Sequence, residues 1–167
     1  MNPNIEKAFL VLLETYKAII YKISHAYAIT PEDRKDLFQE IVVSLWKAYP
    51  SFQEKSKLST WIYRVALYTA ITNYRRSKKQ IRQQSLQPAL YNLAPDDYNG
   101  VQQDETKLLY AAMERLSPVD KAIIILLLEE KSYTEISGVL GITVAAAGMR
   151  IKRAKDKLAN ILTTIKV

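Results

Sequence analysis

The chain is poor in residues that interrupt helices or cross-link a fold. Its 167 residues include no cysteine, four glycines and six prolines. The absence of cysteine excludes disulfides and thiolate metal sites, which fits a reducing compartment. Because helix breakers are few and apolar and polar residues seldom alternate in the pattern of strands, the sequence predicts an all-α fold.

Catalytic and cofactor-binding patterns are also missing. The single histidine, His25, falls on a largely apolar helix, where a structural role explains it. We find no Gly-rich phosphate loop and no set of residues with metal-ligand spacing. Asp33, Asp36 and Glu40 share one helix face and could suggest a metal site, but a solvated, partner-facing surface explains them better. We therefore expect no enzyme, no cofactor and no small-molecule substrate.

Long apolar runs are absent as well. The longest, Ala122 to Leu128, has seven residues, whereas a membrane-spanning helix needs about 20. The segment from Met1 to Lys7 lacks a basic stretch leading into an apolar run, so we expect no secretory signal. Likewise, the chain ends soon after the last expected helix, so we expect no C-terminal regulatory extension. The sequence predicts a cytoplasmic protein.

Positive charge is plentiful and is concentrated in two regions. Lysine and arginine number 24 against 17 acidic residues, which gives a formal net charge of +7. Residues 1–79 carry +6, residues 80–104 carry −2 and residues 105–167 carry +3. This division favours two separate surfaces for polyanions, above all nucleic acid.

Helix signals divide the chain into two domains. Thr30-Pro31 and Ser117-Pro118 each combine a capping hydroxyl with a proline suited to the first turn of a helix. Ser59-Thr60 is interpreted as a third cap. The apolar pattern predicts helices at about 3–28, 31–48, 61–79, 105–115, 118–130, 134–140 and 144–162. Residues 80–104 hold Pro88, Pro95 and Gly100 with few large apolar residues, so they are expected to form a flexible linker between domains 1–79 and 105–167.

The segment from Tyr133 to Val144 has the pattern of a helix-turn-helix. Gly141 can adopt the left-handed backbone conformation that a tight turn needs, and Thr143 can cap the following helix. Apolar side chains are expected to fill the angle between the helices: Ile136, Leu140, Ile142 and Val144. The second helix of such a motif enters the DNA major groove. A plain helical hairpin is the alternative.

The helix that starts at Val144 has an apolar face and a basic face. Its inward stripe is Val144, Ala147, Ile151, Ala154, Leu158 and Ile161. We expect DNA on the other side, at Thr143, Ala145, Ala146, Met149, Lys152 and Arg153, with Arg150 on the flank. The leading residues cannot form bidentate hydrogen bonds with bases, so readout must depend on the cations and on DNA shape. A merely solvated basic face is the alternative.

Two N-terminal segments carry a more specific pattern. Asp33 to Trp46 contains Asp-Leu-Phe-Gln-Glu and ends in Trp, and Ser59 to Ala66 reads Ser-Thr-Trp-Ile-Tyr-Arg-Val-Ala. In combination they resemble region 2 of extracytoplasmic-function sigma factors in the sigma-70 family, and the segment from Tyr133 to Leu158 resembles region 4. The resemblance covers nearly all the chain outside the linker. It implies a bacterial sigma factor that binds RNA polymerase core and promoter DNA and is a monomer when free, with an anti-sigma factor as a further partner.

The resemblance also implies roles for residues. Asp36, Gln39, Glu40 and Trp46 correspond to the helix that docks on the polymerase's largest subunit, although Trp46 is equally well explained as core. The minus-ten element would be melted by Trp61, Arg64, Tyr68, Asn73, Arg75, Arg76, Lys78 and Lys79. Melting needs rings to catch unstacked bases and cations to follow the strand. Trp61 fits the core equally well.

One position departs from the family pattern. Relatives usually carry Asn seven residues after this tryptophan, where it helps to read a base, and this chain has Tyr68. Asn73 lies about one helical turn further on and is no simple substitute. The preferred minus-ten sequence is therefore left open. A helix-turn-helix regulator that binds duplex DNA without polymerase remains the alternative function; it would be expected to dimerise and would leave the segment from Asp33 to Ala66 unexplained.

Overall fold

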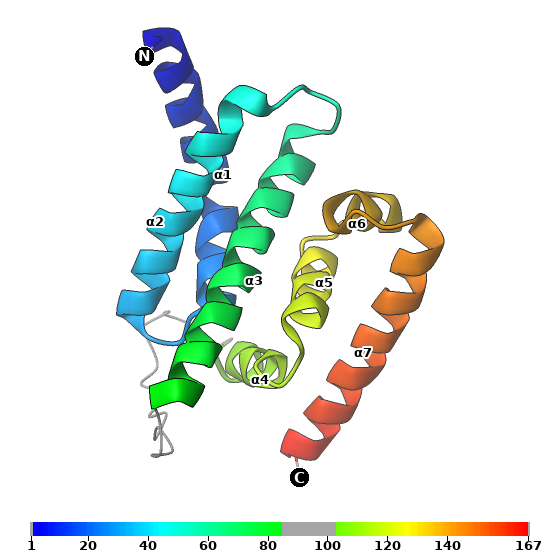
Figure 1. Ribbon diagram of the computed structural model, residues 1–167. Coiled ribbons are helices and arrows are strands. Elements are labelled where there is room, and N and C mark those ends of the chain that lie inside the picture. Colours follow the sequence, from blue (N-terminus) through cyan, green and yellow to red (C-terminus); the bar gives the residue numbers. More distant parts are fainter. Residues whose placement is uncertain (1, 85–102, 167) are drawn as a thin grey trace. The chain divides into compact units, whose positions relative to one another are not determined.

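The computed structural model describes residues 2–84 and 103–166, and within these ranges every regular element is helical (Figure 1). The elements are α1 (Pro3–Tyr27), α2 (Pro31–Ala48), the 3-10 turn η1 (Tyr49–Ser51), α3 (Leu58–Gln84), α4 (Gln103–Met113), α5 (Pro118–Leu128), α6 (Tyr133–Leu140) and α7 (Val144–Lys166). They form two compact units, Met1–Tyr74 and Arg75–Val167. The predicted all-α class is confirmed, and most of the expected linker, residues 85–102, lies outside the described residues.

Local capping explains where the helices begin. The Thr30 hydroxyl accepts a hydrogen bond from the Asp33 N–H at 3.1 Å, and the Ser117 hydroxyl accepts one from the Asp120 N–H at 3.1 Å. Both confirm the predicted starts of α2 and α5, since a capping oxygen satisfies an N–H that has no partner within the helix.

Helix α3 is longer than predicted at both ends. It begins at Leu58, so Ser59 and Thr60 lie in its first turn and do not form the expected cap. It continues to Gln84 because neither proline nor glycine interrupts the sequence before Pro88.

The N-terminal unit is built around the α1–α2 pair, with α3 beside it (Figure 1). Ile20, Ile23, Leu37, Ile41 and Leu45 are almost completely buried at three- and four-residue spacings on α1 and α2. Aromatic contacts join neighbouring segments around this core, and one of them lies at the surface, where Tyr21 is 59% exposed. They are Phe9–Trp46 at 4.9 Å, Tyr21–Phe38 at 4.5 Å and Phe52–Trp61 at 5.0 Å between ring centroids.

The C-terminal unit is centred on α5. Residues 121–126 of this helix are all buried, and α4, α6 and α7 supply Met113, Ile136 and Ile151 to the same core. Lys121 is the charged residue in that stretch, and its ammonium bonds to the Glu114 carboxylate at 3.1 Å. This ion pair allows the lysine to lie inside the core, because a buried charge is costly unless it is paired.

Candidate nucleic-acid interface

Helices α6 and α7 form a helix-turn-helix. Their axes are bent 98° from each other, within the usual range for this motif, and the turn after α6 leads into the upper end of α7 in Figure 1. Gly141 ends α6 in the left-handed region, with φ 68° and ψ 35°, and its N–H donates to the Ser137 carbonyl. The Thr143 hydroxyl accepts from the Ala146 N–H at 3.1 Å and caps α7. The predicted turn and cap are both confirmed.

The turn gives a stability prediction with a matched control. We expect Gly141→Ala to lower the free energy of unfolding by about 1–2 kcal/mol, since a Cβ disfavours the left-handed conformation; space is not limiting, because no atom lies within 4 Å of a Cβ added there. Gly148→Ala should instead raise it by up to about 1 kcal/mol, since alanine favours a helix interior and its Cβ would meet Tyr133 at an ordinary 3.8 Å. Urea unfolding of both variants measures this. Equal effects of the two substitutions would contradict our account of the turn.

The buried face of α7 largely matches the predicted stripe. Ala147, Ile151 and Ala154 are fully buried, and Leu158 and Ile161 are half-buried. Val144 was expected to face inward, and this is wrong: it is 47% exposed. Val144 is the first residue of α7, directly after the turn, so less of the unit surrounds it than surrounds Ala147 one turn later.

The residues predicted to contact the upstream duplex lie outside the buried stripe: Thr143 is the N-cap of α7, Arg150 lies on the flank of the helix, and the others lie toward the opposite face. Thr143, Ala145, Met149, Arg150, Lys152 and Arg153 are exposed, and Ala146 is half-exposed. Lys157, by contrast, bonds to the Asp120 carboxylate at 2.7 Å, so its charge serves the α5–α7 packing. The cations on this face therefore gather around the middle of the helix.

A shallow groove of about 630 Å³ runs between α2 and α3 in the N-terminal unit. Tyr68 lies on its α3 side and is 73% exposed, with Arg64 one turn before it and Thr72 one turn after it. Lys47 and Glu40 line the α2 side. An exposed ring beside a cation is the arrangement that binds an unstacked base.

Two other residues predicted at the minus-ten surface are engaged within the domain. Trp61 is 9% exposed and packs against Phe52 and Tyr49, with ring centroids 5.0 and 6.3 Å away. Of the two explanations for Trp61, this geometry corresponds to the core. Asn73 donates its amide N–H to the Glu40 carboxylate at 2.7 Å, a contact that joins α3 to α2. This contact was not predicted. It links Asn73, which was predicted at the minus-ten surface, to Glu40, which was predicted at the polymerase surface.

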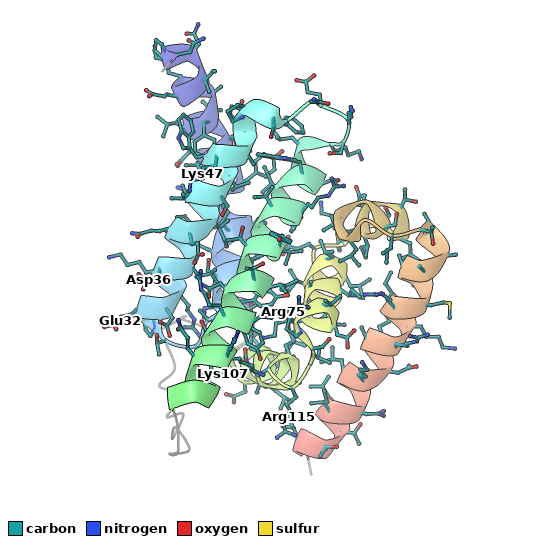
Figure 2. The ribbon with its side chains drawn as sticks, viewed as in Figure 1. Glu32, Asp36, Lys47, Arg75, Lys107 and Arg115 are labelled. Carbon is teal, nitrogen blue, oxygen red and sulfur yellow. The ribbon has the colours of Figure 1, made fainter. Side chains whose placement is uncertain are left out.

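The end of α3 carries the predicted basic cluster, which we define as Arg75, Arg76, Lys78 and Lys79. All four side chains are exposed, and Figure 2 labels the first of them. The cluster begins two helical turns beyond Tyr68 on the same helix. A strand whose base stacked on Tyr68 would therefore find cations along its path.

The surface of α2 predicted to meet the polymerase is partly exposed. Asp36 and Gln39 are exposed, and Figure 2 shows Glu32, Asp36 and Lys47 along this helix. Val43, which the sequence reasoning did not single out, is 48% exposed one turn after Gln39. Trp46 is half-buried against Phe9, which corresponds to the core explanation that was left open for it.

Neither a metal cluster nor a single membrane-spanning helix is present among the described residues. No three His, Cys, Asp or Glu residues in that part of the chain gather closely enough to hold a metal ion. Among the described helices, none has by itself the length and apolar character to cross a membrane. The bent pair Tyr133–Leu140 and Val144–Ile165 meets these criteria together, on length and composition only.

Comparison with known families matches both units. Residues 12–80 match the model of sigma-70 region 2, and residues 106–158 match that of sigma-70 region 4. The chain belongs to the sigma-70 family, in its extracytoplasmic-function (ECF) group. Helix α2 and helix α3 as far as residue 80 thus fall in region 2, and α6 with α7 as far as residue 158 falls in region 4.

Two curated relatives share about a quarter of their aligned residues with this sigma-70 family member. It is 26% identical to the ECF RNA polymerase sigma factor SigG of Mycobacterium tuberculosis, over 83% of this chain but 45% of SigG. It is 24% identical to the ECF RNA polymerase sigma-E factor of Haemophilus influenzae, over 93% of this chain and 87% of that protein. The chain therefore spans about half the length of SigG and most of the sigma-E factor.

Solved structures show the same fold. The sigma factor RpoE in a complex with the anti-sigma factor NepR from Bartonella quintana superimposes with a TM-score of 0.69 at 19% identity, covering 94% of this chain and 98% of that one. CnrH, solved with the cytosolic domain of CnrY, gives a TM-score of 0.66 at 20% identity, over 95% and 90% of the two chains. At these identities the likeness concerns the fold alone.

Proposed function

We propose that this chain is a sigma factor: it binds RNA polymerase core and directs transcription to particular promoters. One observation carries the proposal, namely that a region 2 unit and a region 4 unit occur together, each with cations on its surface. Residues 1–79 would act at the polymerase and the minus-ten element, and residues 105–167 at the upstream element. Catalysis would remain with the polymerase in the cytoplasm, and this chain would supply no cofactor.

The proposed upstream contact uses α7. Lys152 and Arg153 are exposed on the face opposite the buried stripe and Arg150 is exposed on its flank, so all three can reach phosphates while the leading turn enters the major groove.

The proposed minus-ten contact uses the outer side of α3. Tyr68 would stack on an unpaired base, Arg64 would lie beside it, and the basic cluster would follow the strand. We leave Trp61 and Asn73 out of this contact because both side chains are engaged within the domain.

The proposed polymerase contact uses the outer face of α2, with Asp36 and Gln39 as polar groups and Val43 as an apolar anchor. Glu40 would act indirectly, by holding Asn73. The likeness to RpoE, solved with the anti-sigma factor NepR, supports a further partner for this chain, an anti-sigma factor.

The alternative function is a regulator that binds duplex DNA without polymerase. It is tested by measuring the oligomeric state of the free chain and its binding to polymerase core. We expect the free chain to be a monomer by multi-angle light scattering and to co-elute with polymerase core in a one-to-one complex. A regulator that reads two half-sites needs a dimer and no core. A stable dimer that fails to co-elute with core would favour the regulator.

A further inference from the structure

The first six residues of α7, 144–149, carry no polar side chain, and this determines how they can contact DNA. We infer that they recognise the C5 methyl groups of thymines in the upstream element and do not read bases through side-chain hydrogen bonds. The inference rests on the proposed function, because it assumes that α7 enters the major groove.

The side chains at this end of α7 offer almost no hydrogen-bonding groups. Residues 144–149 read Val-Ala-Ala-Ala-Gly-Met, and none of these side chains donates a hydrogen bond. Ala145 is exposed, and Met149, on the same face one turn later, is 60% exposed. The Thr143 hydroxyl, directly before the helix, accepts the capping bond from Ala146 and keeps its O–H as a donor. The surface presented at the helix start therefore consists mainly of methyl and thioether groups.

Only one of the four bases matches such a surface. In the major groove, guanine, adenine and cytosine present acceptors and amino groups, whereas thymine adds a methyl group that alanine and other apolar side chains contact. A G·C pair beneath Ala145 and Met149 would lose water from its polar edge without gaining a partner, which is unfavourable. Thymines at these positions would bury apolar surface instead.

The surrounding charges indicate duplex DNA as the occupant, in preference to a protein. Arg150, Lys152 and Arg153 follow directly after the apolar turns and are exposed. An apolar tip flanked by cations complements a methyl-rich groove floor between two phosphate backbones. Asp156, also exposed, lies on the same face one turn after Lys152, so we place the trailing limit of the DNA-facing surface there.

The test begins with the holoenzyme, reconstituted from the full chain and polymerase core. The holoenzyme first selects sequences from a random library of DNA duplexes. The sequences that it enriches more strongly than core alone are then footprinted. The upstream element is the segment whose protection is lost when Arg150 and Arg153 are replaced. Each thymine in that segment is then replaced by deoxyuridine, which lacks only the methyl group. We expect about fourfold weaker binding for each contacted methyl.

Variants of the chain identify the side chains responsible. Met149→Ala should reduce the ratio of thymine to deoxyuridine affinity by about two- to fourfold, because the longer side chain supplies the methyl contact. Arg150→Ala should weaken binding to the thymine duplex and to the deoxyuridine duplex by the same factor, so the ratio of the two affinities should not change. Leu128→Ala serves as the matched control: this apolar residue is 56% exposed at the end of α5, outside the helix that forms the proposed DNA surface.

The outcomes separate this inference from the proposed function. If the holoenzyme enriches no sequence beyond core alone, the proposed function fails. If it does enrich a segment, but deoxyuridine binds as well as thymine at every position, methyl recognition is overturned. Methyl recognition is also overturned if Met149→Ala leaves the ratio of thymine to deoxyuridine affinity unchanged. Residues 144–149 would then be available to contact a protein partner.

Discussion

Asp36→Arg combined with Gln39→Arg is expected to raise the dissociation constant for RNA polymerase core by about 100-fold or more. Both side chains are exposed on α2, so the fold should tolerate the change. We propose that this helix meets a basic surface on the polymerase, and like charges brought together at an interface cost several kcal/mol. Glu40 is deliberately left intact, because its carboxylate holds Asn73 and its loss would disturb the domain itself.

A second double variant with the same change in net charge serves as the control. Glu14→Arg with Gln53→Arg changes net charge by the same amount at exposed positions outside the proposed α2 surface. Competition binding against labelled wild-type chain, at two salt concentrations, measures both variants. Wild-type affinity in the Asp36 and Gln39 variant, with circular dichroism showing a folded chain, would place the polymerase contact elsewhere.

The two basic surfaces are expected to give opposite defects. Arg150→Ala with Arg153→Ala should weaken upstream duplex binding by the holoenzyme and flatten its salt dependence by about one unit of slope for each phosphate that is no longer neutralised. This variant should still open a template that already contains a bubble, because α3 is unchanged. The reason is that these arginines and Tyr68 belong to different units: the arginines fall in the region 4 match and Tyr68 in the region 2 match.

Arg75→Ala with Arg76→Ala should leave upstream binding intact and impair opening of a closed template. Both side chains belong to the basic cluster of α3, and we propose that this cluster follows the melted strand. Permanganate footprinting on closed and pre-opened templates distinguishes the two pairs. Lys7→Ala with Lys17→Ala on α1 is the control for the reduced positive charge. Identical defects from both arginine pairs would contradict the two-surface proposal.

Local features of the fold could be predicted from the sequence because they depend on neighbouring residues. Thr30 and Ser117 cap their helices through N–H groups three positions away, and Gly141 meets the backbone requirement of a single turn. The inward stripe of α7 followed from helical spacing alone, apart from Val144 at its start, where the position in the tertiary fold determines exposure.

Contacts between distant residues could not be predicted in the same way. Asn73 and Glu40 are 33 positions apart, and nothing in either segment marks them as partners. The position of Trp61 depends on Phe52 and Tyr49, whose rings meet it only once η1 and the following loop are folded. The groove that displays Tyr68 likewise requires α2 and α3 side by side.

Run-off transcription is the most direct test of the central claim that this chain directs polymerase to promoters. Purified core from the same organism would be incubated with genomic fragments, with and without the chain, and the transcripts mapped. We predict discrete start sites that appear only when the chain is present and that disappear with Asp36→Arg and Gln39→Arg. Transcripts that are the same with core alone would contradict the claim.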